Sequence, residues 1–544
     1  MAVEITERID MDAENKKGIG LAALVAIIVS GAIGGGVFNL SNDLATNASP
    51  GGVVISWIVI GFGILMLVLS LNHLVVNKPE LSGVSDYARA GFGNMVGFIS
   101  GWGYWLSAWA GNIAFAVLMM TSVDYFFPGV FQAKNGSLTI LSVIVVSIVS
   151  WGLTLLVMRG VEGAAAINSI VLVAKLIPLF VFVIAGIVTF KAGVFSAHFW
   201  QNFVANTNAD GVIKSLTWSN MTGGDLFSQV KGSLMVMIWV FVGIEGAAMM
   251  GDRAKRKSDA GKASILGLIA LLVIYILLSL LPFGFMSQQE LANTGQPGLV
   301  HILNAMVGGW GGSLMAIGLV ISLLGAWLSW TMLPVEATQQ LSEQKLLPSW
   351  FGKLNDKGAP KNSLLLTQLI VQIFLIVTYF VADAYNVFVY LCTAVIMICY
   401  ALVGLYLFKL GIQEKKTSNI IIGFIAAAFQ ILALYYSGWQ FVWLSLILYA
   451  VGFILYALGK KEYGTRMSTA ELIATFVLTV LGILAVFGVY GNWLGLQDAL
   501  GIDGNTLLVA VVPLIVVTFI VYFVVRSDIK QKRNKKLSEG VQKW

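Results

Sequence analysis

Long apolar segments follow one another along almost the whole chain, separated by short polar loops. A helix needs about 20 apolar residues to cross a bilayer, and segments of this length predict fourteen membrane spans. These spans start near residues 20, 52, 95, 138, 164, 233, 264, 312, 363, 385, 419, 440, 469 and 506. The pattern predicts an all-α polytopic membrane protein, whose even number of spans places both termini on one side.

Glycines interrupt two of these apolar segments near their middle. The first segment, about residues 21–44, contains the run Gly31-Ala32-Ile33-Gly34-Gly35-Gly36, and the second, about 233–250, contains Gly243-Ile244-Glu245-Gly246. Unwound backbone in a bilayer is costly unless protein or a water-filled cavity pairs its polar groups. Glycines can also serve only close helix packing. Two breaks at corresponding places nevertheless favour a substrate site near the bilayer midplane.

The two breaks also suggest an internal repeat. Each break begins a set of five predicted helices, and because five is odd, the second set is inverted relative to the first. These repeats cover about residues 20–190 and 233–409, and the long loop at about 191–231 suggests a lid or an outward helix. We divide the chain into four parts. They are a cytoplasmic tail (1–18), a transporter core (19–410), additional transmembrane helices (411–526) and a basic cytoplasmic tail (527–544).

Composition and charge agree with this topology. The chain is 58% hydrophobic and 11% charged, which excludes an ordinary soluble protein. Of its 33 Lys and Arg residues, 28 fall in alternate loops on one face, so the positive-inside rule predicts cytoplasmic termini in the plasma membrane. The net charge of +6 is then explained by basic residues in the cytoplasmic loops and tail. The charge gives no reason to expect a nucleic-acid partner.

Two ionisable residues stand out inside the predicted spans. Glu245 is the only carboxylate that we place deep within a span of the two repeats, where low dielectric favours the neutral acid and permits proton exchange. Lys175 is the only cation placed there, and its ammonium can bridge helix ends and carbonyls as a sodium ion does. The alternatives are a structural hydrogen bond for Glu245 and snorkelling of Lys175 to the interface.

Aromatic residues and glycines complete the candidate chemistry. Most membrane tryptophans anchor at the interface, but Trp239 and Trp330 lie away from span ends, where indole faces attract cations. The amides of Gly34-Gly35-Gly36, at the end of a half-helix, would attract a carboxylate. A site with these two ends fits an amino acid, particularly a basic one.

Cofactor chemistry is not expected. Cys392 and Cys399 lie seven residues apart on one predicted helix, about 10 Å by helical rise, which is too far for a disulfide and indicates packing residues. The three histidines, His73, His198 and His301, have no metal-ligand spacing around them. We predict no cofactor and no metal.

Five motifs, in order and spacing, resemble the basic amino acid/polyamine antiporters of the amino acid, polyamine and organocation superfamily. The resemblance is closest to bacterial arginine/ornithine antiporters and covers about residues 18 to 410. The motifs are Ser30-Gly31-Ala32-Ile33-Gly34-Gly35-Gly36-Val37-Phe38, Tyr87-Ala88-Arg89-Ala90-Gly91-Phe92-Gly93, Tyr104-Trp105-Leu106-Ser107-Ala108-Trp109-Ala110-Gly111-Asn112, Trp239-Val240-Phe241-Val242-Gly243-Ile244-Glu245, and Trp330 with Leu347-Pro348 downstream.

This resemblance implies a five-plus-five inverted repeat of the LeuT type, with an amino acid or amine bound between helices 1, 3, 6, 8 and 10. It implies that Gly34, Gly35 and Gly36 bind the carboxylate and that the carbonyls of Gly243 and Ile244 bind the amino group. It also implies that Trp239, Trp330 and Asn112 contact the substrate side chain. Tyr104 and Glu245 would act in proton sensing or gating. Lys175 would occupy the position that a sodium ion takes in related transporters.

The sequence departs from the family pattern in two ways, and the first leaves the substrate open. Relatives that exchange arginine for agmatine can have a polar residue where Gly31 stands and a Ser where Gly35 stands, and the last two helices exceed the twelve common in the superfamily. Exchange of arginine for ornithine is our first choice of function. Histidine/histamine exchange, lysine/diamine exchange and a proton-coupled permease remain alternatives, and a homodimer in the lipid bilayer is left open.

Other classes of membrane protein fit the sequence less well. A channel needs a continuous polar lining, and no ring of charged residues is visible in the predicted spans. A membrane enzyme needs a nucleophile with a base, or a metal cluster, inside a span, and neither spacing is present.

The topology yields a first prediction. A cysteine introduced at Asn208 should react with an impermeant thiol reagent on intact cells, because the 191–231 loop lies on the face with few basic residues. The unmodified chain is the control, since Cys392 and Cys399 lie within a predicted span. Labelling that appears only after permeabilisation would reverse the topology.

Overall fold

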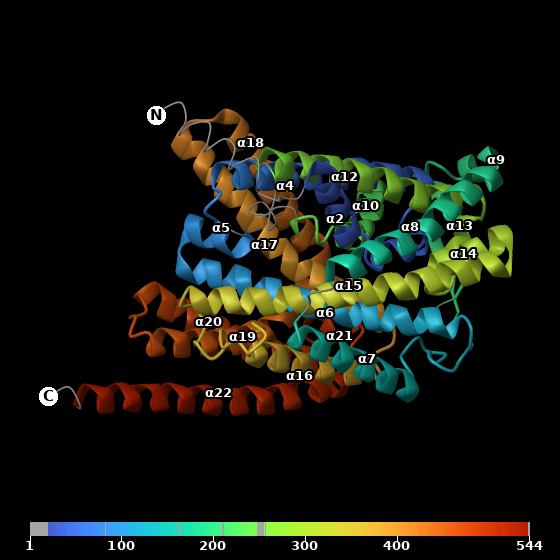
Figure 1. The fold of residues 1–544 in the computed structure, drawn as a ribbon. Helices are drawn as coiled ribbons and strands as arrows, with labels where there is room; N and C mark the ends of the chain where they lie inside the picture. The colour runs from blue at the N-terminus through green and yellow to red at the C-terminus, as the bar shows by residue number, and fades with distance from the viewer. Residues whose placement is uncertain are drawn as a thin grey trace.

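A computed structural model describes residues 20–81, 83–160, 164–208, 212–246, 255 and 257–541. Long helices run side by side in one bundle (Figure 1). The first part of the chain forms α2 (Leu21–Ala32), η1 (Gly36–Phe38), α3 (Leu40–Asn47), α4 (Pro50–Asn77), α5 (Gly83–Phe92), α6 (Asn94–Asp124), α7 (Ile140–Met158), α8 (Ala164–Thr189) and α9 (Ala192–Ser196).

The middle of the chain begins with a two-stranded antiparallel hairpin, β1 (Gln201–Thr207) and β2 (Ile213–Asn220). The following helices are α10 (Gly223–Trp239), α12 (Lys257–Leu280), η3 (Leu281–Gly284), α13 (Gln288–Ala292), α14 (Gly298–Val307), α15 (Gly309–Glu343), α16 (Lys361–Val377) and α17 (Ala384–Glu414).

The last part forms α18 (Thr417–Ala433), a π-helical turn η4 (Leu434–Gly438), α19 (Trp439–Glu462), α20 (Thr469–Tyr490), η5 (Trp493–Gly495), α21 (Leu496–Leu500) and α22 (Gly504–Val541). Within the described residues, ten helices are long and apolar enough to cross a membrane, and four apolar helices are shorter. The predicted multi-pass membrane protein is therefore confirmed at this level.

Most predicted span starts lie within a few residues of a helix start, and the largest difference is at α10. This helix begins at Gly223 and not near residue 233, because Thr222 and Asp225 form a capping box that satisfies the first amides. The polar first turns carry no hydropathy signal, so the hydrophobic pattern missed them.

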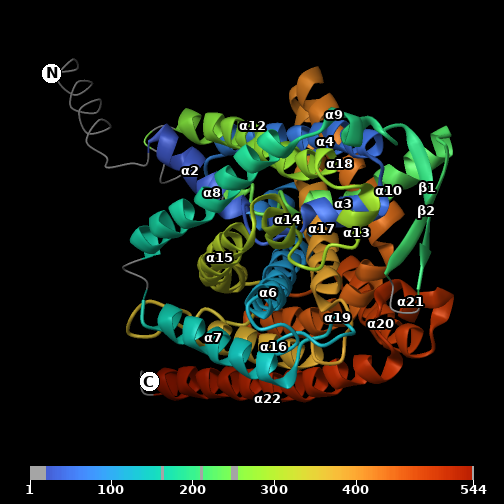
Figure 2. The same cartoon turned by 90° about the vertical axis from the view of Figure 1, so that its right-hand side faces the viewer.

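The loop at about residues 191–231 contains more than the helix that we expected. Besides the short α9, it contains the β1–β2 hairpin, seen at one side of the bundle in Figure 2. Asn293, just after α13, holds the hairpin through Nδ2 to the Ile213 carbonyl at 2.8 Å and through Oδ1 to the Ile213 amide at 2.9 Å. The hairpin is thus tied to the segment between α12 and α14.

Helix α6 lies at the centre of the bundle (Figure 2). It packs along α15 and α17, and nearly all of its apolar length is buried. Small residues permit this close packing: a Cβ on Gly101 would lie 2.7 Å from Leu341 Cδ2 of α15. Cys392 and Cys399 of α17 are free thiols buried against this helix, as predicted.

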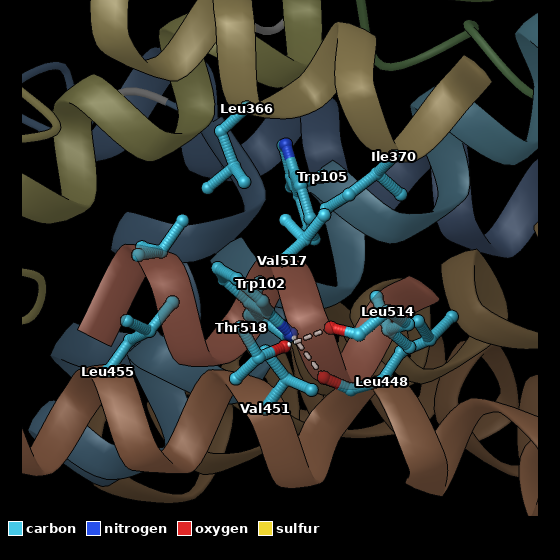
Figure 3. A pocket seen from close by; sticks show the side chains of 11 residues that line it. Trp102, Trp105, Leu366, Ile370, Leu448, Val451, Leu455, Leu514, Val517 and Thr518 are labelled. Atoms are coloured by element: carbon cyan, nitrogen blue, oxygen red, sulfur yellow. Dashed lines mark hydrogen bonds between the residues drawn. The ribbon is translucent and has the colours of Figure 1, made fainter. Parts of the chain in front are cut away.

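The C-terminal helix attaches to the outside of this core. Apolar residues of α22, including Leu514 and Val517, lie beside Trp102 and Trp105 of α6, with α16 and α19 on either side (Figure 3). Beyond the apolar part of α22, Lys532 contacts Glu462 at 3.3 Å, tying the helix to the end of α19.

Candidate functional site

Both predicted helix breaks are present, and they meet in the core. The first separates α2 from α3, and the second follows Trp239, where the chain continues in turns to Glu245. Gly243 has φ +103°, and a Cβ there would lie 3.1 Å from the Gly31 carbonyl oxygen. A left-handed conformation and this close approach of two backbones both require glycine.

Side chains from neighbouring helices bind the carbonyls exposed at each break. Lys175 of α8 is 1% exposed, and its Nζ donates to the Ser30 carbonyl and, at 3.0 Å, to the Ile33 carbonyl. At the second break, the Tyr275 hydroxyl of α12 donates to the Val240 carbonyl at 2.8 Å. The interruptions therefore leave these groups paired inside the bilayer.

The glycine run after α2 leaves backbone donors available. The Gly34 amide donates to the Ala32 carbonyl at 2.8 Å, whereas the amides of Gly35 and Gly36 donate to no acceptor among the described residues. Two buried amides at a break between half-helices form a site that favours an anionic group such as a carboxylate.

Three aromatic rings pack beside these glycines. The centroids of Trp239 and Trp330 are 5.9 Å apart with the planes at 69°, and Phe115 of α6 lies 5.9 Å from Trp239 and 5.5 Å from Trp330. Rings in van der Waals contact with a planar group between them need about 7 Å. A substrate side chain between the two indoles therefore requires them to separate.

Glycines also make room for these indoles. A Cβ on Gly36 would lie 2.4 Å from Trp239 Cδ1, and one on Gly111 would lie 2.8 Å from Trp330 Cζ3. The glycine run therefore has two uses, because it exposes amides and leaves room for the Trp239 ring.

Glu245 lies in a cage of hydrogen-bond donors. Its carboxylate is buried and accepts from the Gly243 amide at 3.0 Å and from the Tyr400 hydroxyl of α17 at 2.5 Å. The hydroxyl of Tyr104 on α6 interacts with the same carboxylate. Loss or gain of a proton here would change bonds to two further helices.

The model of the amino acid permease family matches residues 19–439. The chain belongs to this family. It is 98% identical over 522 residues to the arginine/ornithine antiporter ArcD1 of Lactococcus lactis, which covers 96% of this chain and 99% of that protein. It is 69% identical over 476 residues to the arginine/ornithine antiporter ArcD2 of the same species, covering 88% and 96%. An arginine/agmatine antiporter of Chlamydia pneumoniae is 34% identical over 486 residues, covering 87% and 97%.

These permease relatives are named as transporters and not as enzymes. Of the predicted site residues, the structure brings together Gly34, Gly35, Gly36, Trp239 and Trp330. A second group contains Tyr104 and Glu245.

Two predicted contacts have other bonds in this conformation. Asn112 Nδ2 donates to the Trp330 carbonyl at 3.0 Å, and the Gly243 carbonyl accepts from the Gly246 amide at 3.0 Å. Ile244 is buried next to Gly243. The roles of all these residues toward substrate stay predictions.

Sequence reasoning missed four residues of this region. Phe115, Tyr275 and Tyr400 look like ordinary apolar-segment aromatics in the sequence. The fourth, Asp43, is a second buried carboxylate: it is 8% exposed in the first turn of α3 and accepts from Asn39 Nδ2 at 3.1 Å. Its spacing of four residues from Asn39 was the available signal, since such pairs meet on one helix face.

We predict that Lys175→Ala slows or abolishes exchange while substrate still binds, because the ammonium joins α8 to the broken first helix. Binding is measured by ligand-induced thermal stabilisation and exchange by counterflow. Lys191→Ala, just beyond the end of α8 and exposed, is the matched control. Equal losses of binding and transport would indicate a substrate-contacting or folding role instead.

We also predict that Glu245→Gln flattens the pH dependence of exchange. The amide keeps the size and hydrogen bonding of the side chain but cannot ionise, so it separates proton exchange from packing. Initial rates across a pH series provide the measurement, with Glu343→Gln at an exposed position of α15 as the control. If the variant keeps the wild-type profile, Glu245 is only a structural hydrogen-bond partner.

Proposed function

We propose that this protein exchanges external arginine for internal ornithine across the plasma membrane. The observation that carries the proposal is the 98% identity to an arginine/ornithine antiporter over 99% of that protein's length. The 69% identical relative is also named as an arginine/ornithine antiporter. Few residues differ between the two aligned sequences, so few could give this chain a different substrate.

The geometry of the core supports a zwitterionic, cationic substrate. The amides of Gly35 and Gly36 suit the α-carboxylate, and the carbonyls of the second break suit the α-amino group. The indoles of Trp239 and Trp330 offer π-faces to a guanidinium or ammonium without a matching carboxylate. Arginine and ornithine both have an α-carboxylate, an α-amino group and a cationic side chain. One site can therefore carry either in turn.

Alternating access requires that the site open to one side at a time. At the outer half, Ser41 donates to the Leu278 carbonyl at 2.8 Å and the Gly298 amide donates to Asn39 Oδ1 at 3.1 Å. At the cytoplasmic half of the proposed arrangement, Ala23 and Gly31 of α2 are exposed. These observations support a conformation that is closed outside and accessible from the cytoplasm.

The proposed architecture is fourteen spans with two inverted five-helix repeats at about residues 20–190 and 233–409. Four further helices follow, with both termini cytoplasmic. The two mutually contacting breaks support the repeats, because each break begins one of them. Rocking of the broken helices and their partners against the remaining core would move the site between the two sides.

Counterflow in proteoliposomes tests the function. Vesicles loaded with ornithine should take up labelled arginine, and empty vesicles should not, because an exchanger needs substrate on both sides. A panel of unlabelled histidine, histamine, lysine, agmatine and diamines then ranks the alternatives. Equal uptake by loaded and empty vesicles would replace the exchanger with a uniporter, a channel or a proton-coupled permease.

We predict that Trp330→Leu weakens binding of a cationic substrate by about 1 to 2 kcal/mol, or roughly 5- to 30-fold, because the indole supplies cation attraction at a desolvated position. Trp239→Leu should behave similarly. Apparent affinity from counterflow is the measurement, and Trp310→Leu, exposed at the outer end of α15, is the control. Unchanged affinity in both test variants would leave the indoles with a packing role only.

A further inference from the structure

A small polar cavity lies next to Asn112, between α6, α7, α15 and α16. It offers about 10 Å³ to the centre of a water-sized sphere, and Ser150, Thr154, Trp327, Thr331 and Gln368 are among the residues that line it. A space of this size holds about one water molecule. The cavity is distinct from the glycine and indole contacts described above.

Two buried polar atoms belong to residues that line this cavity. Asn112 is 2% exposed and Gln368 is 4% exposed, yet Asn112 Oδ1 and Gln368 Nε2 have no hydrogen-bond partner among the described residues. One atom is an acceptor and the other is a donor. Leaving such groups unpaired in a low-dielectric interior is costly, and buried water is the usual partner.

The other ends of the same side chains are fixed. Gln368 Oε1 accepts from the hydroxyls of Ser150 and Thr154, both at 2.9 Å, and Asn112 Nδ2 donates to the Trp330 carbonyl. The Thr331 hydroxyl donates to the Trp327 carbonyl at 2.8 Å and keeps lone pairs that can accept. The unpaired Gln368 Nε2 therefore offers a donor to the cavity, and Asn112 Oδ1 and the Thr331 hydroxyl offer acceptors.

We propose that this cavity binds one ordered water molecule, which accepts from Gln368 Nε2 and donates to Asn112 Oδ1 and to the Thr331 hydroxyl. Through this water, Gln368 becomes a positioning residue for Asn112, and Asn112 in turn holds the backbone of Trp330. The water links the helices α7 and α16 to the wall of the substrate site without touching the substrate.

The donor and acceptor pattern favours water over the cationic end of a substrate. A guanidinium or ammonium carries donors only, so it satisfies Asn112 Oδ1 but not Gln368 Nε2. Water both donates and accepts, and it fits the volume. The water site does not depend on which substrate is carried; only its effect on affinity rests on the proposed function.

The first test is an experimental structure of the full chain in lipid, at a resolution where ordered waters are visible. We expect a density peak within hydrogen-bond distance of both Asn112 Oδ1 and Gln368 Nε2. A cavity without such a peak, in a map that shows other buried waters, would overturn the site. This readout stands even if arginine/ornithine counterflow fails.

The second test compares two glutamines of α16. Gln368→Met should raise the half-saturation concentration of arginine about fivefold, as expected for one unmet hydrogen bond. Gln372→Met should change it less than twofold, because Gln372 makes similar bonds to α7, with Trp151 at 3.1 Å and Ser147 at 2.9 Å, but does not line the cavity.

A third variant separates the water from the fixed end of Gln368. Ser150→Ala with Thr154→Val removes both bonds to Gln368 Oε1 but leaves the Nε2 donor in place. We expect a smaller rise in half-saturation than for Gln368→Met. Equal shifts in Gln368→Met and either comparison variant would assign Gln368 to helix packing and overturn its positioning role.

Discussion

The need to pair backbone carbonyls inside the bilayer is the constraint on which the centre of this permease depends. A broken helix is possible there only if other parts of the protein supply donors. Lys175 and Tyr275 do this for the first and second break. Because these donors come from α8 and α12, the first break cannot move independently of α8, and the second cannot move independently of α12. Helix interruption and coupling between helices are two results of the same bonds.

Lys175 and Glu245, two ionisable side chains of the core, are each surrounded by dipoles and do not pair with each other. Lys175 is surrounded by carbonyls, and Glu245 by an amide and phenolic hydroxyls. Within the described part of the chain, the ion pairs lie elsewhere, for example between Lys460 and Glu471. Breaking a buried ion pair is strongly destabilising, so dipolar cages permit rearrangement during transport at lower cost than a central salt bridge would.

The sequence was most informative where one residue type has few alternative uses in a membrane. The glycine runs at Gly34 and Gly243 and the lone cation Lys175 predicted the breaks and the carbonyl-binding ammonium, since each is expensive without such a role. Partners contributed by distant helices could not be predicted. Tyr400 meets Glu245 across 155 positions of sequence, and only the packing of α17 brings them together. The β1–β2 hairpin was missed because its polar strands follow no membrane pattern.

The placement of α22 has a practical consequence for studying motion. This helix packs on α16, α19 and α20, and its Lys532 is tied to Glu462. The broken helices α2 and α10 are not among its main contacts. A fluorophore or spin label on α22 would therefore lie on the side of the bundle away from the broken helices. Distances measured from it to α4 or α12 would follow those helices relative to α16, α19 and α20.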